Sequence, residues 1–292
     1  MRLLDLTLPS PAENLALDEA LLIAAEEGSC GEVLRLWELS SQAVVVGAGG
    51  SVVIDVNVAA CEADGIPILR RASGGGTVLL GPGCLCFSLV LAYDRAPGLD
   101  QIASSNQYVL GRILKALKTI APNTAIEGTS DLAIARPHFP IRQRPHPPTP
   151  SPRGRGGANP LPLSLGERGL GGEGETLTGV GGESETQGFT LKISGNAQQR
   201  KRRYFLHHGT LLCGFDLEKI PKYLNSPERQ PTYRQTRLHK DFLANLTSTS
   251  AELKALLVDE WQLIDEYSPV PWESVQKLVT EKYSRDDWNR RR

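Results

Sequence analysis

Hydrophobic and polar residues follow two different periods along this chain of 292 residues. Residues Pro11–Glu27 carry apolar side chains at the three- and four-residue spacing of a helix that buries a wide face. Ser10 before this stretch and Gly28 after it are typical of the two ends of a helix. Helical patterns also cover 55–63, 97–120, 216–223, 251–263 and 272–283, and the polar residues 288–292 are expected to fray.

Short runs rich in β-branched, aromatic and alternating apolar residues predict strands. They occupy 3–8, 33–39, 43–47, 66–69, Val78–Leu80, 84–93, 125–127, 131–135, 189–194 and Tyr204–Leu212. We expect 33–39 and 43–47 to pair as a hairpin, and Gly195-Asn196 to form a two-residue turn. Short strands interspersed with helices, without regular βαβ units, predict an α+β sheet domain.

The composition changes abruptly between 137 and 187, where proline and glycine dominate and apolar residues are sparse. Such a segment cannot bury enough apolar surface to offset the conformational entropy lost on ordering. Its first half is basic and its second half is acidic. We interpret it as a disordered insertion between two adjacent strands, and an arm that docks a partner is the alternative.

The bulk composition excludes several classes of protein. A formal net charge of -1 argues against a general nucleic-acid binder, and the apolar runs are far shorter than the roughly 20 residues of a membrane span. The start of the chain does not have the pattern of a signal peptide. Five cysteines without CxxC spacing predict a reduced, cytoplasmic protein with no zinc site. These cysteines are Cys30, Cys61, Cys84, Cys86 and Cys213.

The sequence RRASGGGTV begins at Arg70 and places three consecutive glycines between two predicted strands. Backbone N–H groups in such a loop can approach a ligand closely, because no Cβ stands in the way, and they can form a nest for an anion. Arg70 and Arg71 are expected to place two positive charges at the entrance of the loop. A mobile hairpin turn is the alternative. The pattern matches neither the Rossmann fingerprint nor a P-loop.

Two further blocks follow downstream: LKISGNA at 191–197 and LHHGTLL at 206–212. Together and in this order, the three blocks resemble the lipoate-protein ligase family over most of 11–246. The resemblance implies an α+β fold like the biotin/lipoate protein ligase catalytic domain, a mixed β-sheet flanked by helices. Residues 1–246 would form this domain, interrupted by 137–187. Residues 247–292 would add C-terminal helices packed on it, in a compact form without the C-terminal accessory domain of some ligases.

The resemblance also implies an activity. Such an enzyme uses ATP and Mg²⁺ to convert lipoate or octanoate into an acyl-adenylate, and then joins the acyl group to a lysine of a lipoyl domain. The acceptors would be lipoyl domains of 2-oxoacid dehydrogenase complexes or the glycine cleavage H protein. Neither a nucleic acid nor a membrane is expected as a partner.

Lys192 is the predicted catalytic residue. A lysine inside an apolar run is costly to bury unless it is paired or serves a ligand. The resemblance implies that its charge contacts the acyl carbonyl and the phosphate of the adenylate. Asp131 matches an acidic position near the nucleotide and is the predicted metal ligand. A ribose contact or a turn-capping role for this aspartate is the alternative.

The resemblance implies a larger set of residues that bind the substrate or the adenylate. Arg71 would offer a forked donor to a carboxylate or phosphate. His208 would orient a loop or help to deliver the acceptor lysine, although a histidine within a strand is more often structural. The full set is Arg71, Ser73, Gly74, Gly75, Gly76, Thr77, Ser194, Gly195, Asn196, Ala197, His208 and Gly209.

The chain departs from the family pattern at two places. A His-Asp pair usually follows the glycine-rich block, whereas Leu80 and Gly81 stand here, which leaves the choice between lipoate and octanoate open. Related octanoyl-transferases use a cysteine that residues 121–130 lack, which favours ATP-driven ligation over transfer without ATP. Biotin ligation and a non-catalytic relative that binds an acyl group are further alternatives.

The insertion generates the first testable prediction. Because the entropic cost of closing a loop grows slowly with its length, 137–187 should be dispensable. Replacing it with a Gly-Asp-Gly turn should preserve acylation of a lipoyl domain and raise stability slightly, as measured by thermal unfolding. If the deletion abolished acylation while adenylate formation survived, the segment would instead be a docking arm.

Overall fold

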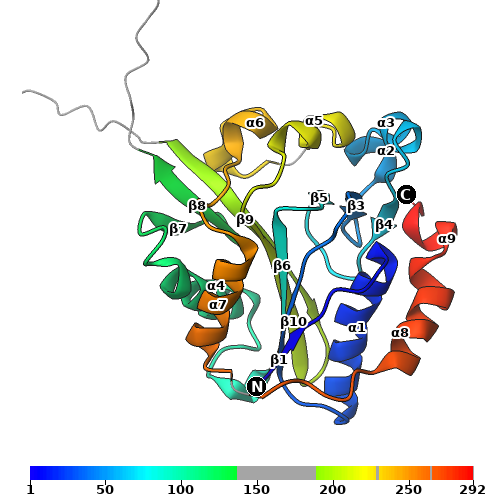
Figure 1. The fold of residues 1–292 in the computed structure, drawn as a ribbon, viewed down its shortest axis with the longest axis vertical. Coiled ribbons are helices and arrows are strands. Elements are labelled where there is room, and N and C mark those ends of the chain that lie inside the picture. Colours follow the sequence, from blue (N-terminus) through cyan, green and yellow to red (C-terminus); the bar gives the residue numbers. More distant parts are fainter. Residues whose placement is uncertain (137–188, 228–229, 264, 292) are drawn as a thin grey trace, which may run out of the picture. The chain divides into compact units, whose positions relative to one another are not determined.

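Seven strands form one mixed sheet in the computed structural model, which describes residues 1–136, 189–227, 230–263 and 265–291 (Figure 1). The predicted insertion at 137–187 lies outside the described residues. Strands β1 and β2 are parallel, and all other neighbours in this sheet are antiparallel. In spatial order the strands are β1 (Arg2–Asp5), β2 (Val33–Trp37), β6 (Cys84–Ala92), β10 (Tyr204–Leu212), β9 (Phe189–Arg200), β8 (Asp131–Arg136) and β7 (Thr124–Glu127).

Helices cover both faces of this sheet (Figure 1). Helix α1 (Pro11–Glu27) lies on one face with α8 (Trp272–Leu278) and the π-helical turn η4 (Val279–Tyr283), and helices α4 (Ile102–Leu117) and α7 (Ser250–Trp261) lie on the other. Side chains of β6 therefore alternate between two cores. Leu85, Phe87, Leu89 and Leu91 belong to the core beneath α4 and α7, whereas Cys84, Cys86 and Val90 face α1. The predicted α+β fold with a mixed sheet flanked by helices is confirmed.

A smaller sheet has the order β4-β3-β5 and is formed by Ile68–Arg70, Ala43–Val46 and Val78–Leu80. Strand β3 is central, parallel to β4 and antiparallel to β5. The remaining short helices are α2 (Val52–Asp55), α3 (Val58–Ala63), α5 (Ile220–Tyr223), α6 (His239–Phe242) and α9 (Asp286–Asn289), with 3₁₀ turns at η1 (Tyr93–Arg95), η2 (Leu217–Lys219) and η3 (Thr232–Arg234). The helix predicted at 55–63 is thus replaced by α2 and α3.

Helix α1 begins and ends where the sequence predicts. The Ser10 side chain accepts a hydrogen bond from the Glu13 N–H, and the Glu13 carboxylate accepts one from the Ser10 N–H. Gly28 ends the helix with a left-handed φ of 81°. These caps satisfy backbone groups that have no partner within the helix, so local sequence is sufficient to set both boundaries.

The predicted hairpin between 33–39 and 43–47 is wrong. Strand β2 lies between β1 and β6, so both of its edges are occupied by strands of the large sheet. Strand β3 instead forms the centre of the small sheet. All residues of β2 and β3 are buried, and periodicity alone cannot say which of two buried sheets a strand joins.

The predicted turn at Gly195-Asn196 is also wrong, because β9 continues through both residues. Gly195 pairs with Asp131 of β8, and Asn196 pairs with Gly209 of β10, so the strand changes its partner here. The glycines are needed for close packing. A Cβ at Gly195 would lie 3.2 Å from Lys192 Nζ, and a Cβ at Gly209 would lie 1.8 Å from Asn196 Oδ1.

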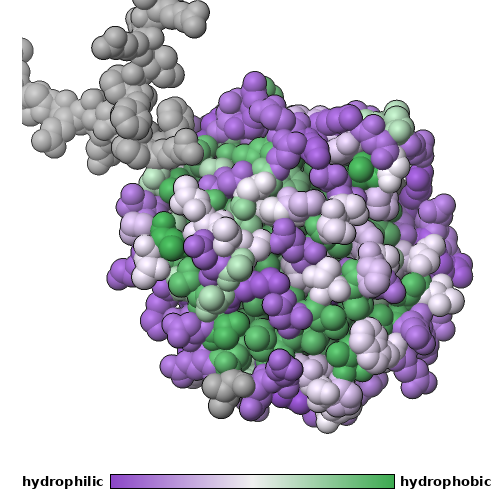
Figure 2. Space-filling view, viewed as in Figure 1, coloured by the Kyte–Doolittle hydropathy of each residue, from purple (hydrophilic) through white to green (hydrophobic). Residues whose placement is uncertain are grey.

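Polar residues cover much of the face seen in Figure 2, and apolar residues form patches between them. None of the helices in the described ranges combines the length and the apolar character that a membrane crossing requires.

Two glycines offer a matched test of this packing. Gly209→Ala should lower the free energy of unfolding by about 1–3 kcal/mol, because its methyl group would overlap Asn196 and Phe87. Gly111→Ala, in helix α4 with open space around it, should raise stability by about 0.5–1 kcal/mol. Urea unfolding of both variants checks the account, and a neutral Gly209→Ala would contradict it.

Candidate active site

The glycine-rich loop joins β4 to β5, which do not pair with each other because β3 lies between them. The loop is therefore not a hairpin turn. The buried side chain of Arg71 holds the glycine-rich loop in its observed shape. The guanidinium donates to the carbonyl oxygens of Val45 (3.2 Å), Gly74 (2.6 Å) and Gly76 (2.8 Å), and Nε donates to Ser73 Oγ at 3.1 Å.

The expectation that Arg70 and Arg71 place their charges at the entrance of the loop is wrong. Both residues are buried, with 0% and 8% of their surface exposed. The Arg70 guanidinium donates to the carbonyl oxygens of Gly47 (2.9 Å) and Gly50 (2.8 Å). Burial lowers the pKa of Arg71 to about 10, so it remains charged at neutral pH. Arg71 therefore holds the glycine-rich loop, and Arg70 holds the backbone of the segment that follows β3.

Gly74, Gly75 and Gly76 are exposed at the tip of the loop. Among the described residues, none accepts a hydrogen bond from the N–H groups of these glycines. A Cβ at Gly75, where φ is +88°, would lie 3.5 Å from the Cβ of Ala197, so the loop tip lies against β9. At the far end of the loop, Thr77 Oγ1 donates to Asp55 Oδ2 at 2.9 Å. The loop thus presents free N–H donors from a braced backbone, as an anion-binding nest requires.

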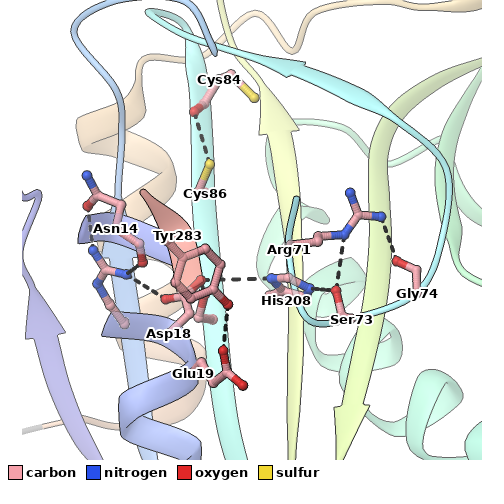
Figure 3. A network of polar contacts seen from close by, with 12 residues as sticks. Asn14, Asp18, Glu19, Arg71, Ser73, Gly74, Cys84, Cys86, His208 and Tyr283 are labelled. Carbon is pink, nitrogen blue, oxygen red and sulfur yellow. Dashed lines mark hydrogen bonds and ion pairs between the residues drawn. The ribbon is translucent and has the colours of Figure 1, made fainter. Parts of the chain in front are cut away.

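His208 connects this loop to the large sheet (Figure 3). Its Nε2 lies 2.6 Å from Ser73 Oγ, and its Nδ1 lies 3.8 Å from Asp18 Oδ2. Asp18 accepts hydrogen bonds from Arg35 (2.6 Å) and Ser88 (2.7 Å). The network ties together α1, β2, β6, β10 and the loop, and a role of His208 in orienting the loop stays a prediction.

Asp18 and Arg35 form a buried ion pair. Burial raises the pKa of the Asp18 carboxyl, but the Arg35 charge together with hydrogen bonds from His208 and Ser88 outweighs burial and lowers it. Sequence reasoning missed both residues. A signal was present, since Asp18 stands on the apolar face of α1 and Arg35 stands within an apolar strand, and two opposite charges at buried positions suggest a pair.

A small pocket opens beside Ser73 and His208. Its wall combines the apolar side chains of Leu15 and Leu206 with polar groups from α1 and β9 and with Tyr283. The Tyr283 hydroxyl donates to Glu19 Oε2 at 2.7 Å. The lining residues are Leu15, Asp18, Glu19, Arg71, Ala72, Ser73, Gln199, Leu206, His208 and Tyr283. Most of the lining side chains are polar or charged, so the pocket offers several hydrogen-bond partners beside a short apolar wall.

Lys192 lies on β9 and forms an ion pair with Asp131, with 2.8 Å between Nζ and Oδ1. The other oxygen of Asp131 accepts a hydrogen bond from the Tyr233 hydroxyl at 2.7 Å. The Lys192 side chain turns along the strand, so its Nζ lies beside Gly195, two residues before Ala197. The ammonium group is therefore held near the tip of the glycine-rich loop.

The neighbouring residues of β9 mainly support this arrangement. Ser194 is buried, and its Oγ accepts a hydrogen bond from Asn196 Nδ2 at 3.1 Å. Asn196 Nδ2 also donates to the Ser130 carbonyl at 2.7 Å. These contacts join β9 to the turn that carries Asp131. Tyr233 was not predicted, and its position after a polar loop gives no sequence signal.

The described ranges contain no cluster of three metal-ligating His, Cys, Asp or Glu side chains. Asp131 supplies one carboxylate, which fits Mg²⁺, because this ion usually binds one or two carboxylates together with substrate phosphates. Asp131 as a metal ligand stays a prediction.

His207 is fully buried beside this site and stacks on Phe87, with 6.3 Å between the ring centroids. Burial, reinforced by the neighbouring His208, lowers the pKa of His207 to about 3. Since its pKa in the unfolded chain is near 6.5, the unfolded state takes up a proton first as the pH falls. His207 therefore contributes to the loss of stability between about pH 6.5 and 3.

The His207→Phe variant tests this contribution, because phenylalanine keeps the stacking and cannot titrate. The variant should lose less stability than the wild type on acidification. The difference in free energy of unfolding between them should change by about 2–3 kcal/mol between pH 7 and 4.5. Urea unfolding at both pH values measures it, and a difference independent of pH would contradict the assignment.

Three comparisons place the chain among known proteins. The family model described as the lipoyl protein ligase A/B catalytic domain matches residues 10–262. A probable lipoate-protein ligase A from Mycoplasma pneumoniae is 25% identical over 292 residues, which cover 96% of this chain and 68% of that protein. Lipoate–protein ligase 1 from Staphylococcus aureus is 22% identical and covers 96% of this chain and 70% of that protein.

Solved structures share the fold at low sequence identity. The bipartite lipoate protein ligase of Thermoplasma acidophilum, studied with its E2 lipoyl domain, has a TM-score of 0.68 and 19% identity over 99% of this chain and 95% of that one. A putative lipoate protein ligase from the same organism, with bound lipoic acid, has a TM-score of 0.67 and 18% identity over 100% and 99%. A lipoate-protein ligase A bound with ATP has a TM-score of 0.64 and 19% identity over 99% and 98%. With the family model matching most of its length, the chain belongs to the lipoyl protein ligase A/B catalytic domain family.

Proposed function

We propose that this protein is a lipoate-protein ligase, which uses ATP to attach lipoate or octanoate to a lysine of a lipoyl domain. The observation that carries the proposal is the placement of Lys192 beside the exposed glycine tip. Asp131 holds the ammonium group near a loop tip whose three glycine N–H groups have no acceptor among the described residues, and a negatively charged acyl-adenylate would bind between them. Preorganised donors of this kind stabilise developing negative charge.

The reaction would proceed in two steps. An oxygen of the acyl carboxylate attacks the α-phosphorus of ATP and releases pyrophosphate, which gives the acyl-adenylate. The amine of the acceptor lysine then attacks the acyl carbonyl and releases AMP. Lys192 would stabilise charge on the carbonyl oxygen and the phosphate, and Mg²⁺ would shield the phosphates when bound.

The other predicted residues have supporting roles in this scheme. Ser73, Thr77 and the three glycines between them would surround the adenylate. Arg71 would act mainly by holding the loop, since its donors already bind loop oxygens. His208 would orient Ser73, to which it is hydrogen-bonded.

Similar proteins support the choice of substrates. Solved structures of similar proteins contain bound lipoic acid or bound ATP, and one similar ligase was studied with its E2 lipoyl domain. By analogy, lipoyl domains of 2-oxoacid dehydrogenase complexes or the glycine cleavage H protein would be the acceptors here. A cytoplasmic location stays a prediction.

Acyl transfer without ATP is the second candidate, because the family model covers both the A and the B types of enzyme. A thiol nucleophile would favour it. Cys84 and Cys86 are buried in β6, and burial raises the pKa of Cys86 well above its usual value. The raised pKa of Cys86 disfavours the thiolate that such chemistry needs, which supports ligation.

Intact-mass measurement of a lipoyl domain separates the two candidates. The domain is incubated with this protein and either octanoate or lipoate, with and without ATP, or with an acylated carrier protein alone. Gain of acyl mass that requires ATP supports ligation. Gain from the carrier protein without ATP would replace it with transfer.

Lys192→Ala should slow ATP-dependent acylation by a factor on the order of 10²–10³, because removing one such donor costs about 3–4 kcal/mol of transition-state stabilisation. Thermal unfolding should change little. Lys201→Ala, in the exposed turn between β9 and β10, is the matched control and should behave as wild type. Cys84→Ser and Cys86→Ser should also stay active. Near-normal turnover by Lys192→Ala, or an acyl group trapped on either cysteine, would argue against the mechanism.

A further inference from the structure

The C-terminal residues packed against the glycine-rich loop are the feature from which we draw a further inference. The sequence predicted that 288–292 would fray, but α9 packs beside β4 instead (Figure 1). We propose that the segment 282–289 is a functional part of the acyl-binding site, with Trp288 and Asn289 as positioning residues for the loop. The proposal rests on the ligase function argued above.

The first observation concerns the edge of the small sheet. Strand β4 is an edge strand, and at Arg70 its backbone N–H and C=O point away from β3. Asn289 Oδ1 accepts the hydrogen bond from the Arg70 N–H at 3.0 Å, and Trp288 Nε1 donates to the Arg70 carbonyl at 2.8 Å. The Arg70 Nε donates to the Trp288 carbonyl at 3.1 Å. Helix α9 therefore provides hydrogen-bond partners for the backbone of Arg70 at the open edge of the small sheet, immediately before the loop.

The second observation links the same segment to the pocket. Asn289 Nδ2 donates to the Tyr283 carbonyl at 2.9 Å, and both residues are buried. Tyr283 lines the pocket, and its hydroxyl donates to Glu19 (Figure 3). Lys282 Nζ binds the same carboxylate at 2.7 Å. One short segment thus contacts both the start of the loop and the pocket wall.

These contacts have a physical consequence for binding. A loop with three exposed glycines has high conformational freedom, and ordering it during binding would reduce affinity. Arg71 braces the loop from inside, while Trp288 and Asn289 hold the strand that delivers Arg71. We call these contacts of Trp288 and Asn289 with Arg70 the clasp. If the clasp is lost, the acyl substrate must order the loop itself during binding. Affinity should fall while the rate from the bound state changes little.

Three variants and one control test the clasp. Asn289→Leu removes the acceptor for the Arg70 N–H, Asn289→Asp keeps it, and Trp288→Phe removes only the indole donor. Asp287→Asn is the control, because Asp287 is exposed on the same helix and pairs with Arg285. Each is assayed for octanoate affinity by calorimetry, for KM and kcat of acylation, and for amide hydrogen exchange of residues 71–77.

Asn289→Leu should raise KM and Kd for octanoate about tenfold, with kcat within about twofold, since the substrate must then order the loop that the lost hydrogen bonds held. Trp288→Phe should show a smaller effect of the same kind. Asn289→Asp should recover part of the affinity, because it keeps the acceptor for the Arg70 N–H but loses the donor to the Tyr283 carbonyl. Amide exchange in 71–77 should accelerate in Asn289→Leu and stay unchanged in Asp287→Asn.

Unchanged loop exchange and octanoate affinity in both Asn289→Leu and Trp288→Phe would overturn the proposal. So would a loss confined to kcat, or one that Asn289→Asp does not relieve. If wild-type protein neither bound nor transferred octanoate or lipoate, the ligase function would fail. The exchange rates would still decide whether α9 holds the loop.

Discussion

The buried guanidinium of Arg71 is the constraint on which the site depends. A charge removed from water must find acceptors for its N–H donors, and the nearest ones are oxygens of the loop that follows it. Meeting this need turns the carbonyls of Gly74 and Gly76 inward. The N–H groups of the loop glycines are left without acceptors among the described residues. The hydrogen bonds of the buried Arg71 guanidinium therefore determine both the charge and the shape of the proposed anion site.

A buried ion pair, separate from the charge of Arg71, positions the opposite side of the pocket. Asp18 and Arg35 neutralise each other between α1 and β2, and Asp18 in turn faces His208. Because His208 reaches Ser73, the loop is connected to the core of the large sheet. Lys192 belongs to a separate network with Asp131 and Tyr233, and its Nζ lies beside Gly195 of β9. The site thus lies where two polar networks and one braced loop meet.

The sequence was informative where structure is determined locally. The boundaries of α1 follow from capping side chains that lie within three residues of the helix end. Pairing over longer distances could not be predicted, which is why the hairpin through 40–42 is wrong. Gly195 looked like a turn residue because sequence does not show that the Lys192 side chain needs the space beside it. The hydrogen bond between Asn289 and Arg70 joins residues 219 positions apart, so no periodic pattern in the sequence indicates it.

The family resemblance selected the candidate site residues, and the structure shows that several of them make contacts the sequence did not predict. Arg70 and Arg71 were expected at the surface, and both instead serve the backbone from within the fold. Lys192 was expected to be paired or to serve a ligand, and it is paired with a carboxylate that also accepts a hydrogen bond from a tyrosine. Asp18, Arg35, Tyr233 and Tyr283 were found only through tertiary contacts.

The most direct test of this account is mass-spectrometric detection of the acyl-adenylate in the absence of any acceptor. Protein incubated with octanoate, ATP and Mg²⁺ would be quenched and analysed for octanoyl-AMP. Wild-type protein should form it in amounts comparable to the enzyme. Arg71→Lys keeps the charge but cannot bind three loop oxygens and the Val45 carbonyl together, so it should form little while remaining folded by circular dichroism. Wild-type levels from Arg71→Lys, or no adenylate from wild-type protein, would contradict the account.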